Sequence, residues 1–219
     1  MNDHRKNLPK IEILRNGVDI MIWDLILGGW INFKGVIHVG GHLGEEIGVY
    51  KTKTSNIHIF EPQKQQFDKI DNSVKKYNVA LGSSKGLMNM HVASNGESSS
   101  LLSPDNPLTK YYPQITFEKS DFVVPVETLD SYGIIDCDFL SIDTQGYELE
   151  VLKGSTETLK HITFILTEIY TEELYKNCPM VSELDMYLKN LNFTRIKTSG
   201  IGDGWGEALY ISNKRLYNI

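Results

Sequence analysis

The chain has 219 residues, of which 41% are hydrophobic and 23% are charged, and its formal net charge is −6 at pH 7. This length suits one α/β domain with a full core, and the composition excludes a disordered or fibrous protein. Because the charge balance is acidic and no large Lys/Arg cluster occurs, we expect no nucleic acid partner. Cys137 and Cys178 stand far apart without metal-ligand spacing, which predicts free thiols in a reducing, cytoplasmic compartment.

The N-terminal segment is predicted to cover the sheet. Residues 18–33 are apolar but are interrupted by two aspartates, and the stretch is shorter than a membrane span. An amphipathic helix is therefore expected there, and no membrane span. We expect a single domain over 1–219, in which residues 1–34 form a helical cover and residues 35–212 form the core.

Residues 35–46, GVIHVGGHLGEE, combine a β-branched apolar run with a glycine turn and two acids. This pattern predicts a buried strand, a tight turn and the start of a helix over 45–50. Gly40, Gly41 and Gly44 permit positive φ and a close approach of backbone to a ligand. Free N–H groups at the start of the helix would suit an anion or a carboxylate, so we expect a cofactor cradle here. A plain structural turn remains the alternative.

The glycine spacing favours S-adenosylmethionine over a dinucleotide. The fingerprint G-x-G-x-x-G would need glycine at Val39. Glu45 and Glu46 would also repel a pyrophosphate, whereas acids near this turn suit the ammonium and sulfonium groups of S-adenosylmethionine.

A second predicted strand, 57–60, ends in Glu61. This acid follows the glycine turn by about 20 residues, where nucleotide-binding folds place a carboxylate that accepts both ribose hydroxyls. A solvated glutamate before a proline turn is the alternative. Residues 63–76 are expected to form a crossover helix, and 77–82 a third strand beside Glu61 that meets the adenine.

The next region is rich in turn residues. Residues 88–93 predict a strand or hairpin, and 94–107 predict a long polar loop. The SSSLL run at 98–102 is either simply flexible or in contact with a ligand.

Residues 138–143 form a buried strand that closes in Asp143, followed by a turn and a helix over 147–153 that Gly154 is expected to cap in the left-handed conformation. Ligands of open parallel sheets bind at the carboxyl ends of strands, so Asp143 is expected to face the crevice. A helix N-cap is the alternative role for Asp143.

A fifth apolar strand, 162–169, places Glu168 near the same edge. Residues 182–191 then have the periodicity of an amphipathic helix, with Ser182 as the candidate N-cap.

Residues 193–198 and 208–212 are predicted to pair as the final strands, joined by a glycine-rich loop that carries Trp205. The alternation of strands and helices predicts a doubly wound α/β sheet that is mostly parallel with an antiparallel last strand. Trp205 either stacks on the sugar ring of an acceptor or packs on the sheet.

These features together resemble the FkbM family of S-adenosylmethionine-dependent methyltransferases over residues 35–211. The most specific part is 126–155, VETLDSYGIIDCDFLSIDTQGYELEVLKGS, which is similar to the family's acid-ended strand followed by E/Q-G and ELEVLKG. Two departures occur: Gln145 stands where many relatives carry Glu, and Gly40-Gly41-His42 replaces a commoner G-A-N turn.

The resemblance implies a class I methyltransferase, Rossmann-like sheet and methyl transfer to oxygen, often of a sugar or another hydroxylated acceptor. It also implies the cofactor contacts. These are Val39, Gly40, Gly41, Gly44 and Glu45 at the methionine end, Glu61 at the ribose, Asn78, Val79 and Ala80 at the adenine, and Ser99, Ser100 and Asp143 near the methyl donor.

Three side chains are candidates for the base that deprotonates the acceptor: Asp143, Glu168 and His42. Asp143 is the first choice, because its strand should neighbour the glycine turn, and Glu168 would orient the acceptor. Asp143 and Glu168 could instead hold a divalent cation, a route we rank second. A nucleotide-cofactor (NAD-type) oxidoreductase and a non-catalytic α/β binding module remain alternatives to a methyltransferase.

Overall fold

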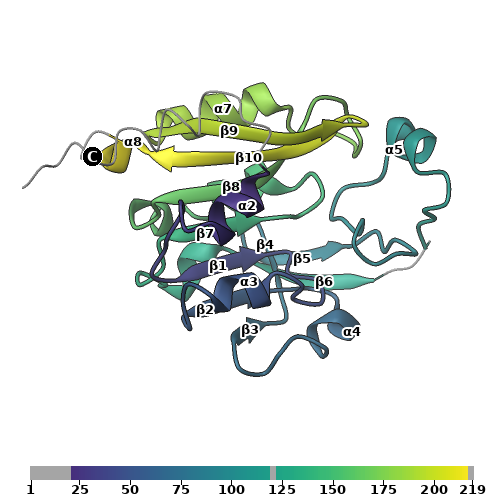
Figure 1. Ribbon diagram of the computed structural model, residues 1–219. Coiled ribbons are helices and arrows are strands. Elements are labelled where there is room, and N and C mark those ends of the chain that lie inside the picture. The colour runs from purple at the N-terminus through teal and green to yellow at the C-terminus, as the bar shows by residue number, and fades with distance from the viewer. Residues whose placement is uncertain (1–20, 119–121, 217–219) are drawn as a thin grey trace, which may run out of the picture.

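The computed structural model describes residues 21–118 and 122–216 (Figure 1). Most of the predicted N-terminal cover therefore lies outside the described residues. Of its described part, only α2 (Ile22–Leu27) is helical, so the helix predicted over 18–33 ends earlier than expected. Within these ranges, no helix has the length and apolar character needed to cross a membrane. Cys137 and Cys178 are buried free thiols, as predicted.

A seven-stranded sheet forms the centre of the molecule, in the order β3-β2-β1-β7-β8-β10-β9. Neighbouring strands from β3 to β8 are parallel, whereas β10 runs antiparallel to both β8 and β9. The predicted mostly parallel sheet with an antiparallel last strand is confirmed. The strands are β1 (Val36–Val39), β2 (Ile57–Phe60), β3 (Lys75–Tyr77), β7 (Phe139–Ile142), β8 (Phe164–Tyr170), β9 (Phe193–Gly202) and β10 (Trp205–Ser212).

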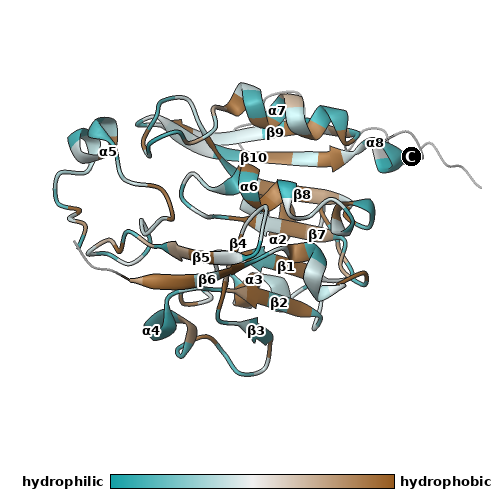
Figure 2. Ribbon diagram, turned by 180° about the vertical axis from the view of Figure 1, so that it is seen from behind, coloured by the Kyte–Doolittle hydropathy of each residue, from teal (hydrophilic) through white to brown (hydrophobic). Residues whose placement is uncertain are grey.

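Helices cover both faces of this sheet, which is why β1, β2 and β7 are buried at every position. On one face, the apolar residues of α2 and α3 (Ile47–Lys51) pack on the sheet, and these helices lie in front of it in Figure 1. On the other face, visible in Figure 2, α6 (Glu148–Lys153) and α7 (Val181–Asn190) supply the core. Burial on both faces explains why the sequences of these strands are continuous apolar runs.

A small second sheet in the order β4-β6-β5 lies beside the main one. Its strands are β4 (Ala80–Leu81), β5 (Gly86–Asn89) and β6 (Val123–Glu127). The predicted third strand over 77–82 is thus wrong in its bounds, because its ends belong to two different sheets, β3 and β4.

The predicted crossover helix over 63–76 is also wrong: α4 (Lys64–Phe67) is one turn long, and β3 follows. The physical reason is tertiary. The Lys76 ammonium donates to the carbonyl oxygens of Phe67 and Ile70, at 3.1 and 2.8 Å, and so provides hydrogen bonds that a longer helix would supply itself. The Tyr77 ring stacks on Phe60 at 4.5 Å, which holds the segment against β2.

Two local predictions at the end of the chain need correction. The α7 N-cap is Met180 rather than Ser182, because the Glu183 carboxylate accepts the Met180 amide at 2.8 Å. Trp205 begins β10 rather than lying in a loop, since β9 and β10 extend to a two-residue turn, Asp203-Gly204, with positive φ at both positions. The remaining described helices are α5 (Asn106–Tyr111), η2 (Leu129–Tyr132), η3 (Thr158–Lys160) and α8 (Asn213–Leu216).

Gly154 does follow α6, but its φ of −82° is not left-handed, so the predicted cap conformation is wrong. Glycine is needed there for space. A Cβ at this position would lie 2.0 Å from the Gly82 carbonyl oxygen, a backbone atom that cannot move away without distorting the chain at the end of β4.

We therefore expect Gly154→Ala to lower the free energy of unfolding by about 1 to 3 kcal/mol through overpacking. Gly48→Ala is the matched control, because its Cβ would meet no atom within 4 Å and its position in α3 favours alanine by up to about 1 kcal/mol. Urea denaturation of both variants measures the difference. Equal stability of the two variants would contradict this account of Gly154.

Candidate active site

A cavity of about 530 Å³ opens at the carboxyl ends of β1, β2, β7 and β8. Residues from the segment 95–115 also line it. Most of the residues singled out in the sequence line this cavity together: Val39, Gly40, Gly41, His42, Glu45, Glu46, Glu61, Val79, Ala80, Ser99, Ser100, Asp143, Gln145, Glu168 and Trp205. Gly44 and Asn78 are not among the lining residues.

The glycines of the turn after β1 have a packing role. A Cβ at Gly40, whose φ is +83°, would lie 1.7 Å from the Asp143 carbonyl oxygen, and one at Gly41 would lie 2.2 Å from the Ile59 side chain. A Cβ at Gly44 would lie 2.5 Å from the Ile47 side chain. These glycines let the end of β1 approach β7 and β2 closely, and this approach brings the site's acids together.

The amides of the turn itself, from Gly40 to Gly44, all have partners within the chain, whereas the sequence predicted free N–H groups at the start of the following helix. The amides of Gly40 and Gly41 both donate to the Phe60 carbonyl oxygen, at 2.9 and 3.1 Å. The His42 amide donates to Glu61, and the next two amides, at 43 and 44, also have partners within the turn. An anion would therefore compete with bonds that are already made, which argues further against a pyrophosphate here.

Glu61 closes β2 as a buried carboxylate whose side chain is 3% exposed. It accepts the backbone amides of His42 at 2.9 Å and Gln63 at 2.7 Å. Burial raises the pKa of Glu61 to about 7, although these two hydrogen bonds act in the opposite direction. The Asn78 amide donates to the carbonyl oxygens of Glu61 and Pro62, at 2.9 and 3.0 Å, so Asn78 supports this corner from outside the cavity.

Asp143 and Glu168 are bridged by Gln145. The two hydrogens of its amide nitrogen go one to each carboxylate, at 2.7 Å to Asp143 Oδ1 and 2.9 Å to Glu168 Oε2. The Tyr175 hydroxyl donates to Gln145 Oε1 at 2.8 Å and fixes which way the amide points. A glutamate at 145 would present oxygens to two other carboxylates, so the departure from the family pattern has a clear electrostatic consequence.

The two bridged acids have different proton affinities. Asp143 is exposed, but its exposed surface faces the cavity, and burial raises the pKa of its carboxyl above the ordinary range. Burial, and then the charges of Asp143 and Glu148, raise the pKa of Glu168 much further. Glu168 also accepts the Tyr170 hydroxyl at 2.7 Å. Near neutral pH, Glu168 therefore retains a proton more readily than Asp143 does.

Glu148, which the sequence analysis did not single out, holds the turn between β7 and α6. Its Oε1 accepts the amides of Thr144 and Gly146, at 3.0 and 3.1 Å, and the side chain is 0% exposed. These bonds fix the backbone of Gln145, whose φ is +55°. The only signal in the sequence was its place as the first acid of ELEVLKG. The alternative role of Asp143, as N-cap of the following helix, is wrong, because Tyr147 takes that position.

The SSSLL segment is ordered by its own contacts. Ser99 Oγ accepts the Ala93 amide at 3.0 Å and donates to the Gly96 carbonyl at 2.7 Å. The Ser100 hydroxyl donates to the Gln145 carbonyl at 2.7 Å. Both serines are buried, so this segment forms a wall of the cavity and is tied to the acid cluster.

The far end of the cavity is aromatic and apolar. The Trp205 indole nitrogen donates to the Tyr112 hydroxyl at 2.9 Å, and both residues line the cavity. Trp205 also packs against a buried cluster that includes Leu108 and Leu174. It therefore combines the packing role and the cavity-lining position that the sequence had left as alternatives.

The described residues contain two groups whose atoms are arranged closely enough to hold a metal ion, and neither includes Asp143 or Glu168. His42, Glu45 and Glu97 lie at the cavity, where His42 Nδ1 is 2.9 Å from Glu45 Oε1. This pairing makes His42 a less direct candidate for the base than Asp143.

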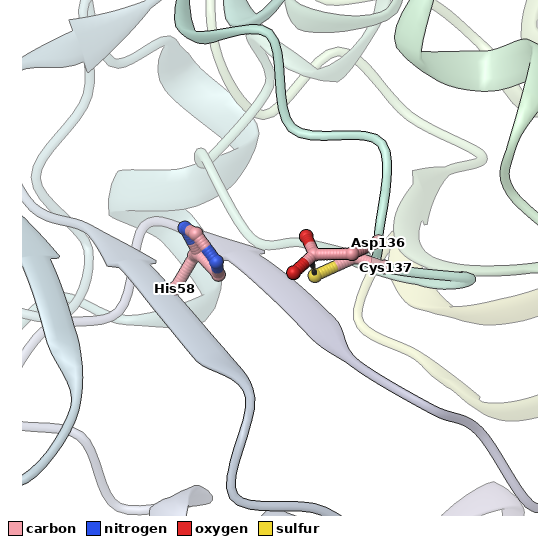
Figure 3. A group of neighbouring side chains, drawn as sticks. All are labelled: His58, Asp136 and Cys137. Atoms are coloured by element: carbon pink, nitrogen blue, oxygen red, sulfur yellow. Dashed lines mark hydrogen bonds between the residues drawn. The ribbon is translucent and has the colours of Figure 1, made fainter.

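The second group consists of His58, Asp136 and Cys137, whose side chains are drawn in Figure 3. None of these three residues lines the cavity. The His58 nitrogens are 3.1 Å from the Tyr77 hydroxyl and 3.1 Å from the Lys75 ammonium. Burial, and then the Lys75 charge, lower the pKa of His58 to about 4. The Lys75 ammonium already contacts the His58 nitrogen that would bind a metal, so we assign no metal there.

Comparison with known proteins identifies the kind of domain. The profile of the methyltransferase FkbM domain matches residues 38–194. The 2-O-methyltransferase NoeI of Sinorhizobium fredii is 31% identical over 128 residues, 52% of this chain and 51% of NoeI. The hexuronic acid methyltransferase AglP of Haloferax volcanii is 27% identical over 136 residues, 60% of this chain and 54% of AglP. The chain thus spans about half the length of these curated relatives.

A solved structure shows the same fold. The crystal structure of methyltransferase FkbM from Methylobacillus flagellatus KT superposes with a TM-score of 0.57 at 14% identity, covering 94% of this chain and 58% of that one. The predicted class I methyltransferase sheet is therefore confirmed.

The buried Glu148 carboxylate yields a prediction about stability and pH. Burial raises its pKa to about 7 in the folded protein, against 4.5 for an ordinary glutamate. Its contribution to stability is thus fully present below pH 4.5 and is lost as pH rises through about 7. We expect Glu148→Gln to remove a pH-dependent loss on the order of 3 kcal/mol over this range.

Urea unfolding of wild type and Glu148→Gln at intervals between these pH values measures the effect. Glu118→Gln, a change at an exposed glutamate outside the cavity, should keep the wild-type pH dependence. If Glu148→Gln keeps it as well, the buried carboxylate is not its source.

Proposed function

We propose that this chain, which belongs to the methyltransferase FkbM domain family, transfers a methyl group from S-adenosylmethionine to a hydroxyl group of a sugar. The observation that carries the proposal is one cavity in which Glu61 and Asp143 stand on either side of the glycine turn. The names of two relatives, a 2-O-methyltransferase and a hexuronic acid methyltransferase, support a sugar hydroxyl as the acceptor.

The residues present fit the proposed cofactor. Glu61 is held by two backbone amides, and carboxylate oxygens that face the cavity suit two ribose hydroxyls. Val79 and Ala80 offer apolar surface for the adenine. Glu45 and Glu46 line the other side of the turn, where negative charge suits an ammonium and a sulfonium. The amides of the turn already donate hydrogen bonds within the chain, and this argues against the pyrophosphate of a nucleotide-cofactor oxidoreductase.

S-adenosylmethionine, when bound, supplies a methyl group that its sulfonium has already activated for transfer. The protein must then align an acceptor hydroxyl and accept its proton. Asp143 is the proposed base, because its carboxylate faces the cavity and its raised pKa makes it more basic than an ordinary aspartate. Gln145 holds this carboxylate in place, and Glu168, which keeps its proton more readily, is positioned to orient the acceptor.

The ribose assignment predicts that Glu61→Ala weakens S-adenosylhomocysteine binding at least about tenfold, because charge-assisted hydrogen bonds worth roughly 1.5 to 3 kcal/mol are lost. Since the ionised carboxylate accepts the hydroxyls, wild-type affinity should also fall as pH drops below about 7, and the variant should not show this fall. Calorimetry with S-adenosylhomocysteine, NAD and NADP measures both effects.

Glu157→Ala, a change at an exposed glutamate outside the cavity, serves as the control. Tight binding of a dinucleotide without binding of S-adenosylhomocysteine would overturn the proposed cofactor. An unchanged dissociation constant in folded Glu61→Ala would overturn only the role of Glu61.

The base assignment predicts that Asp143→Asn lowers kcat by about 100- to 10,000-fold, as expected when a general base is lost. Binding of S-adenosylhomocysteine should persist, because asparagine has nearly the same shape. The wild-type rate should fall on the acid side at a pH above the ordinary range of aspartate, since burial raises the pKa of Asp143. Turnover within threefold of wild type would remove Asp143 as the base, and loss of wild-type activity in EDTA would indicate a metal instead.

A further inference from the structure

The lining of the cavity is strongly unbalanced in charge. Among its described residues are six acids and neither Lys nor Arg. His42 is the one residue of basic type in that lining, and its ring contacts Glu45 at 2.9 Å. The acids are Glu45, Glu46, Glu61, Glu97, Asp143 and Glu168.

From this lining we infer that the acceptor is a sugar without negative charge, either neutral or amino-bearing, and that uronates, sugar phosphates and nucleotide-linked sugars are rejected. The inference rests on the proposed function and names its substrate class. It separates this chain from its relative AglP, whose name gives hexuronic acid as the substrate.

The cofactor would not reverse this charge. S-adenosylmethionine carries an ammonium, a sulfonium and a carboxylate, so its single net positive charge offsets about one acid of the lining. Glu168 is the acid that most readily keeps a proton. The others still outnumber the positive charge, and they face a cavity whose protein walls screen charge less than bulk water does.

The strongest hydrogen bonds to anionic sugars come from Arg and Lys side chains and from free backbone amides. The described lining has neither Lys nor Arg, and the amides from Gly40 to Gly44 already donate within the chain. The structure thus offers an anion no partner at the point where the chain turns toward the cavity.

The acceptor end is built instead for an uncharged ring. Trp205 and Tyr112 are fixed to each other by a hydrogen bond of 2.9 Å, and Leu108, Ile115 and Leu174 line the cavity with them. A rigid aromatic and apolar surface suits the C–H face of a pyranose. Glu97 also lines the cavity and is exposed. An incoming acceptor would therefore meet Glu97 before it meets the buried acids.

The test compares matched sugars on the full chain. Methyl glycosides of glucose, galactose and mannose are each paired with the corresponding uronate and amino sugar, and methyl transfer is followed with labelled S-adenosylmethionine. We expect kcat/KM for the neutral or amino member to exceed that for the uronate at least about tenfold, and the gap to narrow as salt rises. Equal or better use of the uronate overturns the inference.

A charge variant sharpens the comparison. Glu97→Lys should raise the uronate-to-neutral ratio of kcat/KM at least about threefold, because it replaces repulsion by attraction at the exposed part of the lining. Glu118→Lys makes the same change in net charge at an exposed site outside the cavity, and it should leave the ratio unchanged. Equal effects of the two variants would overturn a local role for the lining.

Failure of the inference and failure of the proposed function give different results. Preferential methylation of uronates overturns the acceptor class and leaves the methyltransferase intact. If S-adenosylhomocysteine does not bind in calorimetry, the proposed function itself fails. A third result is that S-adenosylhomocysteine binds while no sugar is methylated and ligand-observed NMR detects no sugar binding. That result overturns both the inferred uncharged acceptor and the proposal that the acceptor is a sugar.

Discussion

The site depends on the close approach of the ends of β1 and β7. The Asp143 amide donates to the Val39 carbonyl oxygen at 2.9 Å, and a Cβ at Gly40 would lie 1.7 Å from the Asp143 carbonyl oxygen. Only glycine fits a backbone contact this tight at a positive φ. This approach sets Asp143 beside the glycine turn. The His42 amide of the same turn donates to the Glu61 carboxylate and holds it in place. One steric constraint thus positions both carboxylates of the proposed site.

The cluster of three acids, Asp143, Glu148 and Glu168, destabilises the fold, and hydrogen bonds to these acids reduce that destabilisation. Burial raises the pKa of all three acids. The charge of Asp143 further raises the pKa of the other two, and the charge of Glu148 raises that of Glu168. The neutral amide of Gln145 gives a proton donor to two of them, and Tyr175 orients it. Apolar residues in place of such buried acids would make a more stable core. Buried acids are therefore retained where function requires them. The role proposed for Asp143 as the base would explain why the cluster is kept.

Much of the fold and part of the site were predictable. Apolar runs with turn residues between them predicted the strands, because strands buried on both faces must be continuously apolar. Acids at the ends of three strands, Glu61, Asp143 and Glu168, were predicted to meet because the carboxyl ends of parallel strands share one edge of a sheet. The helix over 63–76 was not predictable in this way, because contacts made by Lys76 override local propensity.

Outside residues 63–82, the sequence by itself thus determined the main strands, the glycine turn and which acids follow or end the strands, since these follow from periodicity and local backbone preference. Tertiary structure alone decided that the turn amides are occupied, that Gln145 bridges two acids, and that Trp205 joins Tyr112 at the far end of the cavity. It also decided that the lining is acidic without a lysine or arginine among its described residues. The physical reason is that each of these features depends on at least one contact between segments far apart in the chain, which local periodicity does not encode.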